Sequence, residues 1–342
     1  MEFVELQRPA HVMQAPLEPE TIARLCKELL DDEPVAVQPL QGGNFNTLYR
    51  IQLRSGPQVV LRAAPGDYAP LLRHEQTLLR RQCHIQTRLE PLGEVVPALL
   101  THDFSRRHVD RDVAFFSYAG GMRWDLLAPR LGPDQQASLW QQYGVLVARL
   151  HALPGTDFGF VLAPQASYSE HMVSLLLSLQ ADLQDRGVDS DSTRQFVRLV
   201  CEQIERFDAV RQPRLVHGDL WQRNVLIGEG PEGPRISALL DAERAFWGEP
   251  AAEWIFGFLE IPAAFWRGYG KNLSTDALKG EALWRRRVYQ GRGALQLILD
   301  AQRFGFDGGF ARRQLMQCLE LLKPSAGKRP PTSLQACQGV FV

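Results

Sequence analysis

The stretch 215–227 carries the side chains with the clearest chemical potential, because two apolar runs enclose a short polar loop. The loop supplies the carboxylate of Asp219 and the amide of Asn224, and a further carboxylate, Asp241, ends a later apolar run. The glycines and prolines of 230–234 reverse the chain, so we expect Asp241 to lie beside Asn224 across a hairpin. Carboxylate and amide oxygens suit Mg²⁺, which keeps positions open for phosphate oxygens. The spacing therefore predicts a magnesium site for a phosphorylated ligand.

The first third of the sequence has the pattern of strands. Residues Thr47–Arg54 alternate apolar and polar side chains, a Ser-Gly-Pro turn follows, and Gln58–Ala63 forms a second apolar run. This pattern predicts a hairpin. Leucines at helical spacing predict a helix over Pro70–Arg81, and His108–Tyr118 returns to strand character.

After Gly120-Gly121 the pattern becomes helical. Pro133 lies in the first turn of a long amphipathic helix whose apolar face runs from Leu139 to Leu153. Further helices are expected over 166–184, 190–208, 250–270, 280–303 and 307–323, with short strands at 215–217, 224–228 and 236–241. The fold class is therefore α+β. We expect a strand-rich N-terminal domain over 1–117, a larger helical domain over 118–323 and a loose tail over 324–342.

Length and composition indicate an ordinary globular protein of about two domains, with 342 residues, 45% hydrophobic and 23% charged. The 38 basic and 39 acidic side chains leave no basic excess, which argues against nucleic-acid binding. The longest apolar run contains Glu253 and Glu260, so no membrane span is expected. No secretory signal is visible, and five widely spaced cysteines make no C-x-x-C pair. We expect a cytoplasmic protein.

Charge is uneven along the chain. Residues 248–342 hold 13 basic and 8 acidic side chains. The run Arg285–Arg287 is expected on a solvated helical surface. The basic surplus argues modestly against a pocket for a polycation in this third of the chain.

The pattern His217-x-Asp219-x₄-Asn224 followed by Asp241 resembles the catalytic loop and metal-binding aspartate of the protein-kinase-like fold. More closely, H-G-D-L-W-Q-R-N, L-L-D-A-E-R-A and W-G-E-P-A-A-E-W resemble the aminoglycoside phosphotransferase and choline kinase group, over about residues 35–270. The resemblance implies a two-lobed fold with a small strand-rich N-lobe and a larger, mainly helical C-lobe. It implies that Asp219 orients the substrate hydroxyl and accepts its proton, that His217 supports the loop, and that Asn224 and Asp241 hold Mg²⁺ between the β- and γ-phosphates.

The same resemblance places ATP in the N-terminal half. The turn Gln41–Thr47 resembles the phosphate-covering loop, although Gly-Gly-Asn is also an ordinary hairpin turn. Arg62 takes the place of the usual lysine and is expected to pair with the helical Glu75; the alternative is an exposed ion pair. Phe116–Tyr118 fits the purine hinge, although we favour a core position for Phe115 or Phe116. The expected nucleotide-binding residues are Gly42, Gly43, Asn44, Asn46, Arg62, Glu75, Phe116 and Tyr118.

The chain also departs from protein kinases. Trp221 stands where those kinases use lysine, Asp-Ala-Glu replaces Asp-Phe-Gly, and no activation loop follows. A peptide substrate is therefore not expected. We interpret Glu249 as structural. Glu243 is expected as a salt-bridged neighbour of the metal ligands, and a turn of its carboxylate toward the metal is the alternative.

These features predict an ATP-dependent kinase that phosphorylates a hydroxyl group of a small molecule. A fructosamine-kinase-like enzyme is the second reading, although those kinases favour Asp-Pro where this chain has Asp241-Ala242. A catalytically silent nucleotide-binding regulator and a scaffold built on the aromatic residues of 254–266 are alternatives from other classes. The acceptor, the choice of ATP or GTP and the oligomeric state stay open.

Overall fold

The computed structural model describes residues 1–4, 13–41, 43–256 and 259–323, and the chain divides into two compact units. The first unit holds residues 1–71, 75–142 and 221–245, and the second holds 72–74, 143–220 and 246 onwards. This division differs from the expected boundary at 117/118, because 118–142 and 221–245 group with the N-terminal sheet. The expected tail, 324–342, lies outside the described residues.

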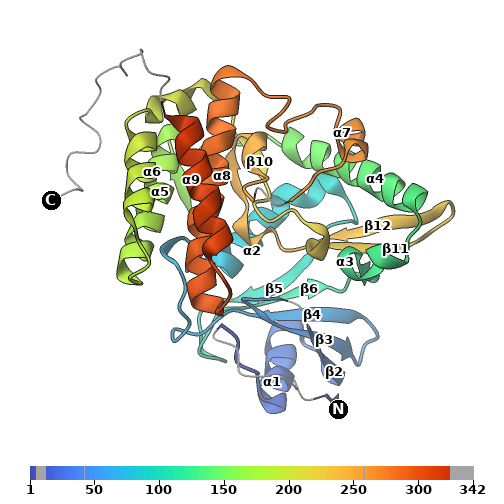
Figure 1. Cartoon of the computed structure of the whole chain (residues 1–342). Helices are drawn as coiled ribbons and strands as arrows, with labels where there is room; N and C mark the ends of the chain where they lie inside the picture. The colour runs from blue at the N-terminus through green and yellow to red at the C-terminus, as the bar shows by residue number, and fades with distance from the viewer. Residues whose placement is uncertain (5–12, 42, 257–258, 324–342) are drawn as a thin grey trace. The chain divides into compact units, whose positions relative to one another are not determined.

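The first unit is built on a sheet with strand order β1–β2–β3–β4–β6–β5. Its strands are Glu2–Phe3 (β1), Pro34–Leu40 (β2), Thr47–Leu53 (β3), Gln58–Ala63 (β4), Leu99–Asp103 (β5) and Val113–Ser117 (β6). The predicted hairpin is confirmed, because β3 pairs antiparallel with β4. Alternate residues of β3, among them Tyr49 and Ile51, face a core that helix α1 (Pro19–Leu30) covers (Figure 1).

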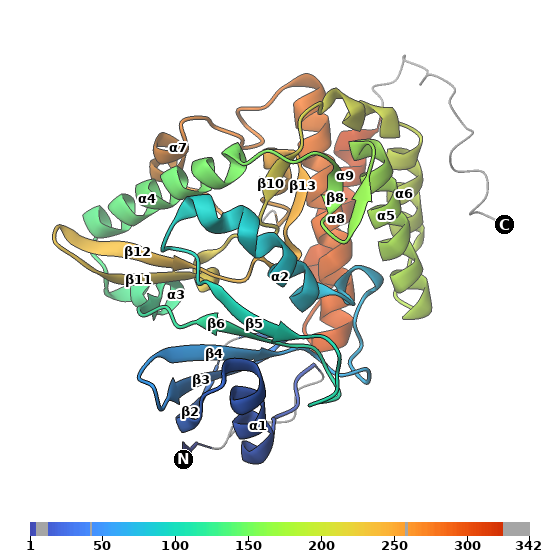
Figure 2. The ribbon, with the colours of Figure 1, turned by 180° about the vertical axis from the view of Figure 1, so that it is seen from behind.

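A second sheet of the first unit contains the hairpin that the spacing of Asn224 and Asp241 predicts. Its order is β12–β11–β7, with β7 at Met122–Arg123, β11 at Val225–Gly230 and β12 at Gly233–Leu239. Strands β11 and β12 form a long antiparallel ribbon (Figure 2). Helix α3 (Trp124–Leu127) follows β7, and helix α4 (Pro133–Ala152) begins at the predicted proline.

The helix expected over Pro70–Arg81 begins later than predicted. A 3₁₀ turn, η1 (Arg73–Glu75), precedes helix α2 (Leu78–Leu89). The backbone N–H of Arg73 donates to the Asp182 carboxylate at 3.1 Å and its guanidinium does so at 2.5 Å. These bonds fix residues 72–74 to the helix that carries Asp182. The α-helical hydrogen-bond pattern of α2 begins only after this segment. Helix α2 then packs on β6 through Leu79, Cys83, Ala114 and Phe116.

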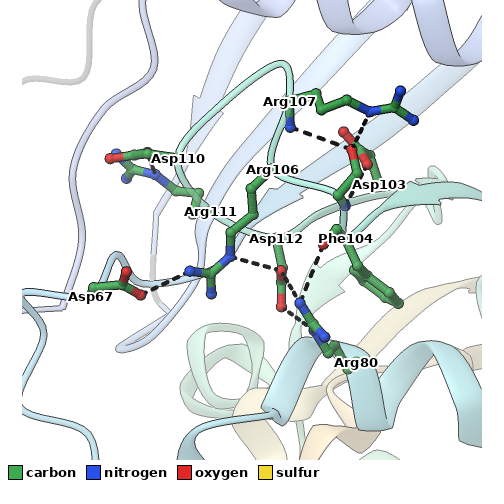
Figure 3. A network of polar contacts seen from close by, with 10 residues as sticks. Asp67, Arg80, Asp103, Phe104, Arg106, Arg107, Asp110, Arg111 and Asp112 are labelled. Atoms are coloured by element: carbon green, nitrogen blue, oxygen red, sulfur yellow. Dashed lines mark hydrogen bonds and ion pairs between the residues drawn. The ribbon is translucent and has the colours of Figure 1, made fainter.

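A polar network holds α2 at the beginning of β6. The buried Asp112 carboxylate accepts two hydrogen bonds from Arg80 of α2, at 2.6 and 2.9 Å, and one from Arg106 at 3.3 Å. Arg106 also donates to Asp67 at 3.0 Å (Figure 3). Because Arg80 binds both carboxylate oxygens, a rotation of α2 would break a charge-assisted pair at a buried anion. The network therefore fixes the position of α2, which carries Gln82 of the site described below.

The second unit combines a small sheet with a layer of helices. The sheet order is β10–β13–β8–β9, from strands Arg214–Val216 (β10), Phe246–Gly248 (β13), Phe158–Phe160 (β8) and Ala163–Gln165 (β9). Helices α5 (Tyr168–Asp185), α6 (Asp191–Cys201), α8 (Gly280–Phe304) and α9 (Gly309–Leu322) lie side by side (Figures 1 and 2). Ser167 and Ser190 cap α5 and α6 with their hydroxyl groups. The helices predicted over 166–184, 280–303 and 307–323 are confirmed. The helix predicted over 190–208 ends at Cys201, and a 3₁₀ helix, η4 (Ile204–Ala209), follows it.

The helix expected over 250–270 forms only in part. A 3₁₀ turn, η7 (Pro250–Ala252), and helix α7 (Ala263–Tyr269) lie within this range, and residues 257–258 are outside the described part. Pro262 has no backbone N–H and stands directly before α7, which places the helix start at that point.

Two of the three arginines in the run Arg285–Arg287 do not lie on the solvated surface that the sequence predicts. Arg285 and Arg286 are both only 7% exposed. The Arg285 guanidinium binds both oxygens of Glu249, at 2.9 and 2.8 Å, and Arg286 donates to the carbonyl of Ala251 at 3.2 Å. The interpretation of Glu249 as structural is therefore confirmed. No helix in the described ranges is long and apolar enough to cross a membrane.

Candidate active site

The β11–β12 hairpin brings the two predicted metal ligands together. The backbone N–H of Leu240 donates to the carbonyl of Asn224 at 2.8 Å, so Asp241 follows directly beside Asn224. Asp241 has a left-handed backbone with φ +71°. A non-glycine residue in this region is uncommon and is often found at functional positions. The Asn224 side chain is buried, whereas that of Asp241 is 29% exposed.

Arg62 of β4 lies against this hairpin. One guanidinium nitrogen, Nη1, donates to Asp241 Oδ1 at 2.8 Å and to Gln82 Oε1 of α2 at 2.9 Å. The guanidinium also lies 5.2 Å from the centre of the Phe116 ring. Arg62 is 8% exposed, so its charge is largely removed from bulk solvent. The guanidinium and the Asp241 carboxylate thus form an ion pair that is largely removed from solvent, in which the two charges offset each other.

The expected pair between Arg62 and Glu75 is wrong. The carboxylate of Glu75, only 1% exposed, accepts instead from Arg244 at 3.0 Å. Glu75 lies in η1, before α2, and the α2 residue that faces Arg62 is the neutral Gln82. Arg244, which the sequence analysis does not single out, supplies the cation that pairs with Glu75.

Glu243 is a buried carboxylate between charged neighbours. Asn46 Nδ2 donates to its Oε2 at 2.7 Å. Burial and the nearby negative charge of Asp241 raise the pKa of Glu243 to about 8, although Arg62 and Arg244 oppose this shift. The expected salt bridge is replaced by the hydrogen bond from Asn46. Arg81 of α2 is a buried cation in the same region. Burial and the positive charge of Arg244 lower the pKa of its guanidinium to about 10.

The remaining predicted nucleotide residues have different surroundings. Gly42 lies outside the described residues, and Asn44 is exposed. The carbonyl groups of Gly43 and Asn46 accept hydrogen bonds from Gln14. Phe116 is 3% exposed and belongs to the core, which is the position favoured for it above. Tyr118 is half-buried under the Arg50 guanidinium, 4.3 Å from the ring centre, and its backbone N–H donates to the Gln58 carbonyl at 3.2 Å.

The His217–Asp219 loop belongs to the second unit and is held from below by Glu253. The backbone N–H groups of His217 and Gly218 each donate to this carboxylate at 2.7 Å. Gly218 has φ +79°, a conformation that favours glycine. His217 is 1% exposed, which is consistent with its predicted supporting place.

Two further residues support Glu253. His151 Nε2 lies 3.1 Å from Glu253 Oε2, and His151 Nδ1 lies 2.8 Å from the hydroxyl of Tyr269. A neutral ring with the proton on Nε2 satisfies both contacts, since it donates to Glu253 and accepts from Tyr269. Sequence reasoning missed all three residues. The only available signal in the sequence was Glu253 itself, the second acid of the motif G-E-P-A-A-E-W.

Asn224 and Asp241 fit a magnesium ion that is completed by a ligand. They offer an amide and a carboxylate oxygen, which are hard donors, and Asp241 retains solvent access. Within the described ranges, no three His, Cys, Asp or Glu side chains gather as a complete metal site. Mg²⁺ commonly binds one or two protein oxygens together with phosphates, so a two-ligand arrangement is sufficient.

Solved structures share the fold across nearly the whole chain. A thermostable mutant of aminoglycoside phosphotransferase APH(4)-Ia is 17% identical, with 90% of this chain and 99% of that chain covered and a TM-score of 0.61. A candidate fructosamine-3-kinase from Thermobifida fusca YX-ER1 is 18% identical, with 89% and 99% covered and a TM-score of 0.59. APH(2″)-IIa is 14% identical, with 90% and 97% covered and a TM-score of 0.59. No curated protein sequence matches the chain.

The sequence profile of the phosphotransferase enzyme family matches residues 36–288, which is most of the chain. This match and the shared fold confirm the predicted resemblance and the α+β, protein-kinase-like fold class. The chain belongs to the phosphotransferase enzyme family.

Proposed function

We propose that this protein transfers the γ-phosphoryl group of ATP to a hydroxyl group of a small molecule. The observation that carries the proposal is the cluster of Asn224, Asp241 and Arg62, in which two oxygen donors adjoin a buried cation. Such a cluster suits a metal–triphosphate, because Arg62 and a metal ion held by the two oxygen donors would neutralise phosphate charge from two sides. Family membership supports a kinase-type reaction.

ATP would bind in the first unit. The phosphate-covering loop would contribute Gly42, Gly43, Asn44 and Asn46, and Arg62 would contact the phosphates. Tyr118 would lie at the purine hinge, with Phe116 packed in the core, and Glu75 would act indirectly through Arg244. The APH(4)-Ia structure is a ternary complex with AMP-PNP and hygromycin B, which supports ATP as the phosphoryl donor here. Asn224 and Asp241 would hold Mg²⁺, which when bound would neutralise negative charge on the β- and γ-phosphates.

Asp219 would orient the acceptor. The substrate oxygen forms the new bond to the γ-phosphorus, the bond from that phosphorus to the β,γ-bridging oxygen breaks, and ADP leaves. The hydroxyl proton passes to the Asp219 carboxylate. His217 and Glu253 would keep the loop in place, so that the catalytic contribution is positioning rather than strong basicity.

The acceptor is a hydroxylated small molecule. APH(4)-Ia and APH(2″)-IIa have been solved with hygromycin B and gentamicin, whereas the candidate fructosamine-3-kinase points to glycated amines. The basic surplus of 248–342 favours a neutral or anionic acceptor over a polycation. A metabolite kinase of the fructosamine type is therefore the second candidate. We place the reaction in the cytoplasm, in line with the free thiols of the described cysteines.

The test is Mg²⁺-dependent ATP consumption with a panel of aminoglycosides, peptide antibiotics, macrolides, sugars, amino alcohols and glycated amines. The Asp219→Asn variant is the matched blank. Turnover with one class that the variant lacks supports the function and identifies the acceptor. Equal consumption by parent and variant refutes the role of Asp219, and absence of ATP binding refutes the kinase function.

A further inference from the structure

The segment Met13–Leu17 precedes α1 and lies outside the region that the family profile matches. It is nevertheless built into the first unit. The backbone N–H of Leu17 donates to the Tyr49 hydroxyl at 2.7 Å, and the carbonyl of Ala15 accepts from Thr47 Oγ1 at 3.1 Å and from Arg111 Nη1 at 3.3 Å. The segment is therefore fixed to β3, directly beyond the phosphate-covering loop.

Gln14 connects this segment to the loop itself. Its side chain is buried, and its amide nitrogen, Nε2, donates to the carbonyl of Gly43 at 3.0 Å and to that of Asn46 at 2.6 Å. Its amide oxygen, Oε1, is buried and accepts no hydrogen bond within the described residues. The side chain of Gln14 thus forms its hydrogen bonds through Nε2 alone, and both hydrogens of this nitrogen bind carbonyl groups of the loop.

The two carbonyls lie at either end of the turn that carries Asn44. A loop that covers phosphates must direct backbone N–H groups toward them and keep carbonyl oxygens turned elsewhere, because carbonyl oxygens repel anions. Gln14 engages two of the carbonyls that would otherwise be free to turn. Asn46 also donates through Nδ2 to Glu243, two residues beyond Asp241, so the loop is linked to the metal-ligand hairpin as well.

We propose that Gln14 is a positioning residue for nucleotide binding, which holds the phosphate-covering loop in its receptive conformation from outside the family region. The nucleotide in this inference, ATP, is taken from the proposed function, so this part of the inference rests on that proposal. Its structural half, the restraint on residues 43–46, is independent of that function.

The test compares Gln14→Met with Gln38→Met. Methionine keeps about the length and volume of glutamine and removes the amide group, of which Gln14 uses only the NH₂ donor. Gln38 is an exposed residue of β2 that serves as the matched control. We expect Gln14→Met to raise the KM for ATP about tenfold, as expected for the loss of two neutral hydrogen bonds, with kcat changed less than about threefold. Gln14→Glu, which sets carboxylate oxygens against both carbonyls, should raise KM further.

Amide hydrogen exchange over residues 43–48 provides the readout that does not depend on activity. Faster exchange in Gln14→Met than in Gln38→Met, together with the selective rise in KM, supports the proposal. Unchanged exchange overturns it even if the parent consumes no ATP. Faster exchange with an unchanged KM, or an equal fall of kcat and thermal stability in both variants, also overturns it. A parent that binds no ATP refutes the proposed function and the nucleotide half of this inference, while the exchange result still decides the restraint.

Discussion

Replacement of Glu253 by glutamine should show how strongly the His217–Asp219 loop depends on one buried carboxylate. Both carboxylate oxygens accept a backbone N–H at 2.7 Å, one from His217 and one from Gly218, and the side chain is 0% exposed. Glutamine has the same shape but only one acceptor oxygen. In either orientation its NH₂ group faces one of the two backbone N–H donors, and at the position of Oε2 it faces His151 as well.

The expected magnitude follows from these contacts. A hydrogen bond to a charged acceptor contributes about 1.5–3 kcal/mol, and Glu253→Gln removes one and weakens the other by removing the charge. The variant no longer has to bury a carboxylate, which offsets part of this loss. We expect the free energy of unfolding to fall by about 2 kcal/mol. The loop that carries Asp219 should also be displaced, with kcat reduced about tenfold or more.

Urea unfolding followed by tryptophan fluorescence measures the first quantity. Glu260→Gln is the control, because it makes the same chemical change at an exposed glutamate seven residues further on. A Glu253→Gln variant that unfolds at the same urea concentration as Glu260→Gln, with an unchanged slope, would refute the assigned role of Glu253.

Three other outcomes are expected. Arg62→Ala should raise the KM for ATP about tenfold and leave the fold intact, and an unchanged KM in steady-state kinetics would contradict the phosphate contact. Gly218→Ala should lower stability by about 1–2 kcal/mol in thermal unfolding, since φ +79° is unfavourable for alanine; an equal melting temperature would count against the strained turn. Burial raises the pKa of Cys26 and of Cys83 to about 12, so both should resist a thiol reagent at pH 8 until the protein unfolds. Rapid modification of either thiol in the native protein would show that its burial is transient.

Local patterns predicted the elements that bear the site. The antiparallel pairings β3–β4 and β11–β12 follow from apolar runs separated by short Gly-Pro turns, and these pairings bring Arg62 into the sheet and Asn224 next to Asp241. Such information lies within a few residues of the chain. The family motifs then added the expected roles, which spacing alone does not provide.

The partners of buried charges were not predictable in the same way. Arg62 pairs with Gln82 and Asp241, and Glu75 pairs with Arg244, although the sequence offered a simple Arg62–Glu75 pair. Several cations compete for several acids in this region, and the tertiary packing of α2 decides the outcome. Arg285 was likewise assigned to solvent because its partner Glu249 is 36 residues away.

Supporting contacts were the hardest to foresee. Gln14 and Glu253 act on backbone groups, and any glutamine or glutamate is chemically able to do so. Nothing in the side-chain type indicates which one reaches a given loop. Only the folded chain shows that these two residues hold the loops that the motifs identify.

The assignment of the site is tested most directly by the binding of Mg²⁺–ATP, measured by calorimetry beside turnover, for the parent, Asp219→Asn and Asp241→Ala. We expect Asp219→Asn to bind Mg²⁺–ATP like the parent but to transfer no phosphoryl group, and Asp241→Ala to bind it at least about tenfold more weakly. A parent that binds no Mg²⁺–ATP, or an Asp241→Ala variant that binds it as tightly as the parent, would contradict the assignment of this site.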